Sequence, residues 1–426
     1  MKVSSTKNWL ILSVLVILAL TVMWLMTTNN LKVWPVRNAL QYYVVTWWWD
    51  QVGQPAEAAP GTLQGTVRAV QGQPIAQAWV LISRWDGTTF SARSDDHGRY
   101  VISNVPAGTY RPVAGAAGYE SVELGGFTGR VEIEAGADTL ADVVLPPAAT
   151  PALTPGNDLV LGNPETLSCS QPIASQAIRR EVHFKSEGQP NQLSFYYTPV
   201  TATTTSRLPL LLTIYPGPAD TWECVSLPLS TAGYGLLAVG PAYTFDLETD
   251  LNELERLLMF VREGRFPGSD GSKIALIGGS YSSLHVLRLL QRGQQVEAAL
   301  VMGPPTDLFD MRRRLENGTF VPPFGLDRAF YALGFPDREP LRYWRYSAAY
   351  HVYPDFPPIA ILHSRTDEVV PYQQGELLAA QLAETGIPYE SHFFDGGGHY
   401  LLAEDGDADA LEMYRITLDF LAKYLL

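Results

Sequence analysis

The sequence predicts an α/β domain with a mostly parallel sheet, preceded by a small all-β domain and by one apolar helix. Over residues 166–426, short apolar runs alternate with amphipathic stretches, which is the pattern of buried strands joined by helical crossovers. Residues 61–147 instead contain β runs of five to eight residues separated by turn signals. Residues 9–26 contain no charged side chain. These three observations divide the chain into its main parts.

The first of these parts, after a short tail of residues 1–8, is a predicted transmembrane anchor over residues 9–27. At a rise of about 1.5 Å per residue, the uncharged run is roughly as long as the hydrocarbon core of a bilayer is thick. A cleavable signal peptide is the alternative, but its apolar region is shorter and ends at a small-residue site, which is missing here. Positive charges before and after the run nearly balance. We expect a short cytoplasmic N-terminus, with the catalytic domain extracytoplasmic.

The segment 28–60 is aromatic at first and becomes a linker. Trp47, Trp48 and Trp49 follow one another in a stretch without apolar periodicity. They fit the membrane–water interface, and they equally fit packing against the next domain. The Pro, Ala and Gly residues that follow predict a domain boundary near residue 60.

The β runs of residues 61–147 predict a small antiparallel sandwich. Asp95, Asp96 and His97 have the residue types of metal ligands, but a β-turn explains them better, and no metal site is predicted. The stretch resembles a carboxypeptidase regulatory-like domain, a transthyretin-like sandwich that is usually accessory. The residues that carry the resemblance are Gly65–Val67, Gly72–Ile75, Ala78–Val80, Ser94–Tyr100, Val105–Tyr110 and Gly118–Tyr119. A Pro-rich linker over residues 148–165 is expected next.

In the α/β domain, residues 166–426, reactive side chains are expected just after the carboxyl ends of strands. The apolar run KIALI leads into Gly278-Gly279-Ser280-Tyr281-Ser282 and then into a helix. This is the G-x-S-x-G form of a nucleophile elbow, with Ser282 in place of the last glycine. The helix N-terminus offers backbone N–H groups to a developing oxyanion. Ser280 is therefore the predicted nucleophile.

Two further strand ends supply the partners of a triad. Asp367 follows the strand PIAILHS, and His399 follows the strand YESHFFD. The order Ser…Asp…His is that of α/β-hydrolases. His399 would accept the proton of Ser280, and Asp367 would fix the imidazole tautomer. The other candidates are less well placed: the acids Glu368 and Asp395, and the histidines His285, His363 and His392, which are interpreted as packing or surface residues.

The motifs Gly279-Ser280-Tyr281, His363–Pro371 and Leu208–Pro218 resemble the catalytic domain of the prolyl oligopeptidase family of serine peptidases. The resemblance implies an oxyanion hole formed by the hydroxyl of Tyr215 and the backbone N–H of Tyr281. A ring that simply anchors in the core is the alternative for Tyr215. The β-propeller of the family has no counterpart here, and its Asp-x-Arg-Gly stretch is replaced by VGPAYTFDLETD. The resemblance therefore supports hydrolase chemistry for this chain more strongly than it supports specificity for peptides.

Composition and the remaining segments complete the expectations. With 30 Lys and Arg against 44 Asp and Glu, a net charge of -14 argues against a nucleic-acid partner. Cys169 and Cys224 leave one disulfide possible, although two buried free thiols are the expectation. The aromatic insertion 304–357 is expected to cap the site, with Arg312 to Arg314 on a solvated helix face or near a substrate carboxylate.

The sequence thus predicts a membrane-anchored serine hydrolase that works through an acyl-enzyme and needs neither a metal nor an organic cofactor. By resemblance, peptides are the leading substrates. Small carboxylic esters are the second possibility, and a non-catalytic surface binding protein is the third. No oligomeric state is predicted.

Overall fold

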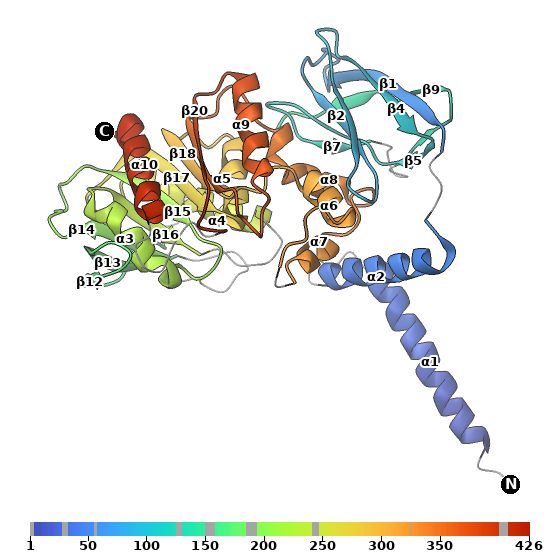
Figure 1. Ribbon diagram of the computed structural model, residues 1–426, viewed down its shortest axis with the longest axis horizontal. Coiled ribbons are helices and arrows are strands. Elements are labelled where there is room, and N and C mark those ends of the chain that lie inside the picture. Colours follow the sequence, from blue (N-terminus) through green and yellow to red (C-terminus); the bar gives the residue numbers. More distant parts are fainter. Residues whose placement is uncertain are drawn as a thin grey trace.

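The computed structural model shows a β-sandwich and an α/β domain packed together, with two N-terminal helices at one side (Figure 1). The structure describes residues 4–27, 33–54, 58–124, 130–149, 158–184, 194–240, 247–323, 325–399 and 408–426. In Figure 1, helix α1 (Ser4–Thr27) projects away from the body and α2 (Trp34–Val52) lies along it. Among the described residues, no helix combines the length and the apolarity needed to cross a membrane. The anchor over residues 9–27 stays a prediction.

Helix α2 is a regular helix where the sequence showed no periodicity. Pro35 lies in its first turn, where a missing N–H costs no helical hydrogen bond. One face packs on α7 (Asp327–Leu333), where the rings of Tyr42 and Tyr331 stack at 3.9 Å between centroids. Arg37 and Asn38 are buried in α2 whereas Trp47 and Trp48 are exposed, so polar and apolar residues do not divide into an outer and an inner face that would reveal the helical period.

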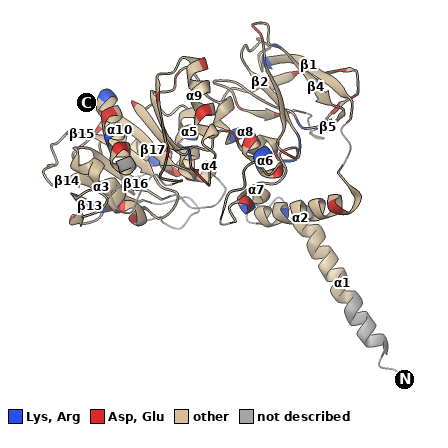
Figure 2. Cartoon of the chain, viewed as in Figure 1, with Lys and Arg blue, Asp and Glu red and all other residues tan. Residues whose placement is uncertain are grey.

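Of the three consecutive tryptophans of α2, one packs against the sandwich and two remain exposed, as expected for a membrane interface. Trp49 packs against Trp85, with ring centroids 4.6 Å apart. Trp47 and Trp48 are 60% and 55% exposed. Figure 2 shows few charged side chains on α2 and on the described part of α1. Five exposed apolar side chains of α2, Val36, Tyr43, Val44, Trp47 and Trp48, are here called the aromatic face; Val52 at the end of the helix is exposed as well.

The sandwich consists of two four-stranded sheets and one strand pair. The first sheet contains β1 (Pro60–Ala69), β4 (Arg99–Pro106), β9 (Asp138–Leu140) and β10 (Val143–Leu145). The second contains β2 (Trp79–Ser83), β3 (Thr89–Arg93), β6 (Val113–Gly115) and β7 (Val122–Glu123). Strands β5 (Gly108–Tyr110) and β8 (Val131–Ile133) form the pair. The Asp95 carboxylate accepts hydrogen bonds from the N–H groups of His97 and Arg99 at 2.9 and 2.8 Å, which is the geometry of a turn.

A ten-stranded sheet forms the centre of the α/β domain. Its path follows the order β11-β13-β14-β16-β15-β17-β18-β19-β20, and β12 pairs with β13. The parallel part runs from β16 to β20 and contains β16 (Gly235–Val239), β15 (Leu208–Ile214), β17 (Ser269–Gly279), β18 (Ala298–Met302), β19 (Ile359–Ser364) and β20 (Tyr389–Phe394). The antiparallel part contains β11 (Val160–Leu161), β12 (Glu165–Cys169), β13 (Ser175–His183) and β14 (Ser194–Pro199). Strand β11 begins inside the predicted linker.

Helices cover both faces of this sheet, as the run of buried strands requires. One face packs against α4 (Leu247–Arg262), α5 (Tyr281–Gln291) and α9 (Gln373–Thr385). The other packs against α3 (Glu223–Thr231) and α10 (Ala408–Leu425). The sheet therefore separates two apolar cores, and the carboxyl ends of its parallel strands lie at one edge of both.

A disulfide joins Cys169 at the end of β12 to Cys224 in α3, with Cα atoms 5.4 Å apart. The expectation of two buried free thiols is therefore wrong. The sequence could not decide the question, because the two cysteines meet only when β12 pairs with β13 and α3 packs beside them.

The described residues of the insertion 304–357 form the α-helices α6 (Leu308–Glu316), α7 and α8 (Pro340–Arg345) and the 3-10 helix η3 (Ala348–Tyr350), which lie between the sheet and the sandwich. Arg312 in α6 is fully buried, pairs with Glu316 at 2.8 Å and donates to the carbonyl of Phe330 at 3.0 Å. Both expectations for Arg312, a solvated helix face and a substrate contact, are wrong. The side chain instead ties α6 to α7.

Candidate active site

Ser280 lies at the sharp turn between β17 and α5, as the sequence predicts. Its φ of 53° and ψ of -125° belong to a region that residues with side chains rarely adopt. A Cβ atom on Gly278 would lie 2.6 Å from the carbonyl oxygen of Ser282, so only glycine fits there. The backbone N–H of Ser280 donates to the carbonyl of Met302 at 2.7 Å. These contacts fix the serine at the carboxyl end of the sheet.

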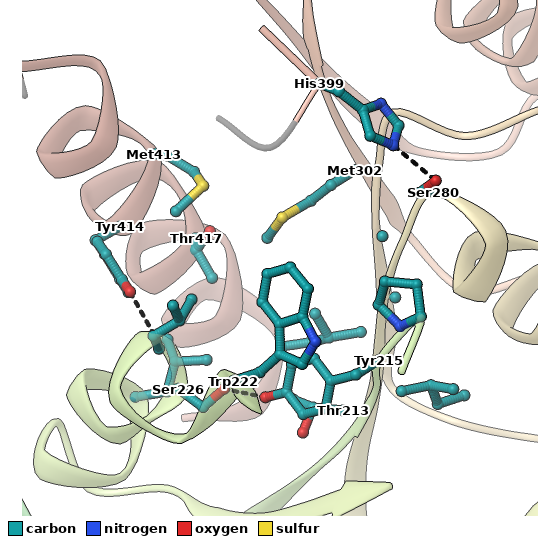
Figure 3. A pocket seen from close by; sticks show the side chains of 17 residues that line it. Thr213, Tyr215, Trp222, Ser226, Ser280, Met302, His399, Met413, Tyr414 and Thr417 are labelled. Carbon is teal, nitrogen blue, oxygen red and sulfur yellow. Dashed lines mark hydrogen bonds between the residues drawn. The ribbon is translucent and has the colours of Figure 1, made fainter. Parts of the chain in front are cut away.

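The structure brings the three predicted triad residues into one hydrogen-bonded chain. His399 Nε2 lies 2.7 Å from Ser280 Oγ (Figure 3). His399 Nδ1 lies 2.9 Å from each carboxylate oxygen of Asp367. The side chains of His399 and Asp367 are 4% and 1% exposed. With Nδ1 donating to the carboxylate, Nε2 is free to accept the serine proton.

The Asp367 carboxylate is held by more donors than His399 alone. Its Oδ1 accepts from the backbone N–H groups of Val369 and Val370, both at 2.8 Å. His363 Nε2 lies 3.2 Å from Oδ2. Burial by itself would raise the pKa of Asp367, but the hydrogen bonds from His363 and His399 hold that pKa well below its usual range. The carboxylate therefore stays ionised beside the imidazole.

His363 is a site residue that the sequence analysis assigned to packing or the surface. The side chain is fully buried, and its Nε2 lies 3.0 Å from the carbonyl oxygen of Val370 as well as near Asp367. Two acceptors around Nε2 place the ring proton on that atom. A Cβ atom on Gly375 would lie 2.7 Å from Nδ1, so glycine leaves the space for the ring. The available signal was the strand-end histidine four positions before the acid, in HSRTD.

The other acids and histidines considered for the triad do not take part in the Ser280–His399–Asp367 chain. Glu368 accepts the backbone N–H of His399 at 3.2 Å, whereas Asp367 is the carboxylate hydrogen-bonded to Nδ1 of the ring. Asp395 is 3.5 Å from Arg365 with its side chain 95% exposed. The remaining histidines pair with carboxylates of their own: His285 with Asp250 at 3.1 Å, and His392 with Glu390 at 3.7 Å.

The two predicted oxyanion donors differ in position. Tyr281 is the first residue of α5, so its backbone N–H lies at the helix N-terminus beside Ser280. The hydroxyl of Tyr215 instead forms a hydrogen bond with Ser226, and Figure 3 shows the ring directed away from Ser280. Burial raises the pKa of Tyr215, which keeps the phenol protonated. This position departs from the one that the family resemblance implies, and it fits the alternative of a ring anchored in the core.

Two cavities meet at the nucleophile. The larger, of about 580 Å³, lies between α5, the insertion helices and the Asp367 loop. The smaller, of about 100 Å³, lies below Ser280 on the side of α3 and α10. Four residues line both: Pro216, Trp222, Ser280 and His399. In the described part of the larger cavity, Arg328 and Glu368 are the charged side chains apart from His399. A substrate bound at Ser280 would therefore meet mainly apolar walls on both sides.

Among the described residues, no cluster of His, Cys, Asp and Glu could hold a metal ion. The chemistry that this arrangement can perform is nucleophilic attack by a serine hydroxyl with histidine as base.

Comparisons with known proteins match two parts of the chain. Residues 62–146 match the carboxypeptidase regulatory-like domain, and residues 262–426 match the prolyl oligopeptidase family. No curated protein matches the sequence significantly.

Solved structures with similar folds include esterases and a peptidase. Thermogutta terrifontis esterase 2 is 17% identical, with a TM-score of 0.44 over 56% of this chain and 92% of that chain. A thermostable esterase from Pseudomonas putida is 17% identical, with a TM-score of 0.48 over 59% of this chain and 83% of that one. Porphyromonas gingivalis dipeptidyl peptidase 4 is 14% identical, with a TM-score of 0.46 over 80% of this chain and 47% of that one.

The two family matches, over residues 62–146 and 262–426, confirm the two resemblances found in the sequence. The C-terminal part of the chain is therefore a serine hydrolase domain of the α/β-hydrolase fold, similar to the prolyl oligopeptidase family and preceded by a carboxypeptidase regulatory-like domain.

Proposed function

We propose that Ser280, His399 and Asp367 hydrolyse an apolar carboxylic ester through an acyl-enzyme intermediate. The observation that carries this proposal is the continuous hydrogen-bonded chain from Ser280 Oγ through His399 to Asp367, which opens into two mainly apolar cavities. His399 Nε2 accepts the Ser280 proton as Oγ attacks the carbonyl carbon. The same proton then passes to the departing alcohol. Water, deprotonated by His399, releases the acid and restores Ser280.

The remaining residues of the site orient His399 and stabilise the charges that form during the reaction. Asp367 keeps the Nδ1–H tautomer of His399 and balances the imidazolium charge that forms. The backbone N–H of Tyr281 and the positive end of α5 stabilise the oxyanion. Tyr215 supports the wall from below through Ser226 and its stacked ring on Trp222, with centroids 6.0 Å apart.

A peptidase is the second candidate, and the match of residues 262–426 to the prolyl oligopeptidase family supports it. Peptide substrates carry backbone N–H and C=O groups on both sides of the scissile bond, and these groups need hydrogen-bond partners when buried. The described walls supply few of them. Esters have fewer such groups to satisfy, so we place them first.

Labelling of the full chain, in detergent, with a fluorophosphonate probe tests the proposed nucleophile. Wild type is expected to be labelled, and Ser280→Ala, which keeps the fold, is expected to remain unlabelled. Absence of labelling in folded wild type would overturn the proposal and favour a binding protein. The ratio of kcat/KM for aryl esters to that for aminoacyl amides then separates esterase from peptidase, with a ratio far above one expected.

We further propose that α1 and the aromatic face of α2 attach the protein to a membrane, with the hydrolase outside the cytoplasm. Support comes from the uncharged run of residues 9–26 and from large apolar side chains of α1 that are 43% to 63% exposed. Tryptophan and tyrosine favour the headgroup region. The Cys169–Cys224 disulfide suits an oxidising compartment. Carbonate extraction of membranes, with protease protection of the C-terminal part, tests attachment and orientation.

A further inference from the structure

The smaller cavity below Ser280 has a wall of its own that the larger cavity does not share. Val225 and Leu229 of α3 form one side, and Met413 and Thr417 of α10 form the other. Met302, at the end of β18, lines the cavity together with His399 (Figure 3). The cavity is thus built by the helices on the α3 and α10 face of the sheet.

The polar side chains around this cavity mostly satisfy one another. The hydroxyls of Tyr215 and Ser226 are hydrogen-bonded together. The Tyr414 hydroxyl donates to the carbonyl of Val225. Thr417 is 2% exposed, and its hydroxyl has no hydrogen-bond partner among the described residues. Apart from His399, no charged side chain is among the described residues that line the cavity. Its occupant should therefore be apolar and uncharged.

The two cavities differ strongly in size. At about 100 Å³, the smaller is below the roughly 150 Å³ of an engineered apolar cavity that holds benzene. The larger, at about 580 Å³, is in the range of sites for drug-sized ligands, roughly 300–1,000 Å³. A chain of about four carbons or fewer is the size that the smaller space accommodates.

We propose that the smaller cavity is a subsite for one short apolar arm of the substrate, while the larger cavity takes the other arm. The substrate class is then a carboxylic ester with one arm of about four carbons or fewer and one bulky apolar arm. This inference rests on the proposed esterase function and adds the selection of its substrate. A polypeptide continuing in both directions fits poorly, because its amide groups would enter the small, mainly apolar space with few hydrogen-bond partners.

Thr417 allows the size of this subsite to be changed in both directions. Thr417→Ile adds a methylene group to the wall, and Thr417→Ala removes part of it. Thr417→Val keeps the shape and replaces the hydroxyl with a methyl group. One added or missing methylene in an apolar pocket changes kcat/KM by about 10- to 200-fold. Two series of esters probe the arms: p-nitrophenyl esters with acyl chains of two to eight carbons, and alkyl esters of naphthylacetic acid with the same range of alcohols.

We expect wild type to lose at least about tenfold in kcat/KM beyond about four carbons in one of the two series. Thr417→Ile should move this limit to shorter chains and Thr417→Ala to longer ones, while Thr417→Val leaves it in place. General destabilisation would instead weaken both size variants on every substrate alike. Leu326→Phe, in the larger cavity, is the matched control and should leave the short-arm limit unchanged.

Fluorophosphonate labelling of every variant separates the two levels of the argument. If wild type and the variants are labelled but no chain-length limit exists, or the limit does not move in opposite directions for Thr417→Ile and Thr417→Ala, the subsite is overturned while the serine hydrolase stands. A limit that moves as far in Thr417→Val as in Thr417→Ile also overturns it. If wild type is not labelled, the proposed function itself fails.

Discussion

At the scale of single residues, the feature that distinguishes this site is one carboxylate shared by two histidines. His399 and His363 both lie near Oδ2 of Asp367, at 2.9 and 3.2 Å. His399 reaches Ser280, whereas His363 turns its proton toward Asp367 and the carbonyl of Val370. In the proposed mechanism His363 is therefore a positioning residue, since it holds the carboxylate that holds the proposed base His399.

Removing His363 should weaken this hold without removing the nucleophile. His363→Ala is expected to lower kcat about tenfold with a smaller effect on KM, since Asp367 loses one donor of about 1.5–3 kcal/mol to a charged group. With that donor gone, the pKa of Asp367 rises, so the acid side of the pH–stability profile should move to higher pH. His363→Gln, which can still donate through its amide, should recover part of the loss. Equal profiles for wild type and His363→Ala would contradict a positioning role.

Asp367 itself couples activity and stability to pH. Its folded-state pKa is depressed, so its contribution to stability is complete above the ordinary carboxyl pKa of about 3.9 and is lost as the pH falls toward the folded-state value. Asp367→Asn should therefore be less stable than wild type at pH 6, and the difference should shrink below about pH 4. Urea unfolding at both pH values measures it. At neutral pH kcat should fall by up to about 10⁴-fold, because the amide favours the wrong tautomer of His399.

At the scale of elements, the disulfide ties the antiparallel start of the sheet to α3. Cys169 and Cys224 enclose a loop with a sequence separation of 55. Arg179 in β13 adds ion pairs to Glu165 and Glu223 across the same elements. The small cavity shares α3 as a wall, so this attachment also bears on its shape.

Loss of this disulfide should be costly, because it relaxes a long loop in the unfolded chain. Cys169→Ala/Cys224→Ala is expected to lower the free energy of unfolding by about 2–4 kcal/mol in urea titrations. Treatment with a reductant should bring wild type to the stability of the double variant and leave the double variant unchanged. Equal stability of oxidised wild type and the double variant would show that the bond adds nothing.

The aromatic face of α2 allows a test at the membrane. In vesicles containing brominated phospholipid, Trp47→Ser/Trp48→Ser should lose a large share of the tryptophan quenching shown by wild type. Trp49, which packs against Trp85, is the internal control, and Trp49→Phe should leave quenching almost unchanged. If both variants are quenched like wild type, the aromatic face does not enter the bilayer interface.

At the scale of the whole molecule, the sandwich and the hydrolase are joined through the insertion helices. Leu81 and Val113 of the sandwich are buried in the same core cluster as Trp344 of α8. Trp344 Nε1 donates to Ser121 Oγ at 2.8 Å, and Ser83 Oγ donates to the carbonyl of Pro336 at 2.8 Å. The helices that line the larger cavity thus lie between the catalytic sheet and the sandwich. The sandwich acts as a support for the cap of the site.

The shared core predicts that the two domains unfold together. Urea unfolding of the full chain can be followed by fluorophosphonate labelling, which reports the hydrolase, and by far-UV circular dichroism, which reports both domains. The two probes should give coincident unfolding transitions. Leu81→Ala should lower the free energy of unfolding reported by both probes by about 2–5 kcal/mol, although Leu81 belongs to the sandwich. A hydrolase transition that ignores Leu81→Ala would show that the cap needs no support from the sandwich.

Much of the fold and the site could be read from local patterns. The eight main strands of the α/β domain follow from buried apolar runs, and Ser280, Asp367 and His399 follow from their places at strand ends. Helix α2 could not be read in this way, because it buries Arg37 and Asn38 and exposes Trp47 and Trp48, the reverse of the usual amphipathic pattern. Arg312 was misassigned for a related reason: nothing in a run of three arginines shows which one turns toward Glu316 and the core.

The sequence alone predicted the serine hydrolase chemistry, since a strained elbow, an acid loop and a histidine loop each have a signature of a few consecutive residues. Tertiary structure decided what depends on contacts between distant segments. It paired Cys169 with Cys224, placed His363 against Asp367, and turned the Tyr215 hydroxyl toward Ser226. It also set the unequal sizes of the two cavities, because their walls come from α3 and α10 on one side and from the insertion helices on the other. Spacing along the chain carries no information about such distances, which arise only when the two cores pack against the sheet.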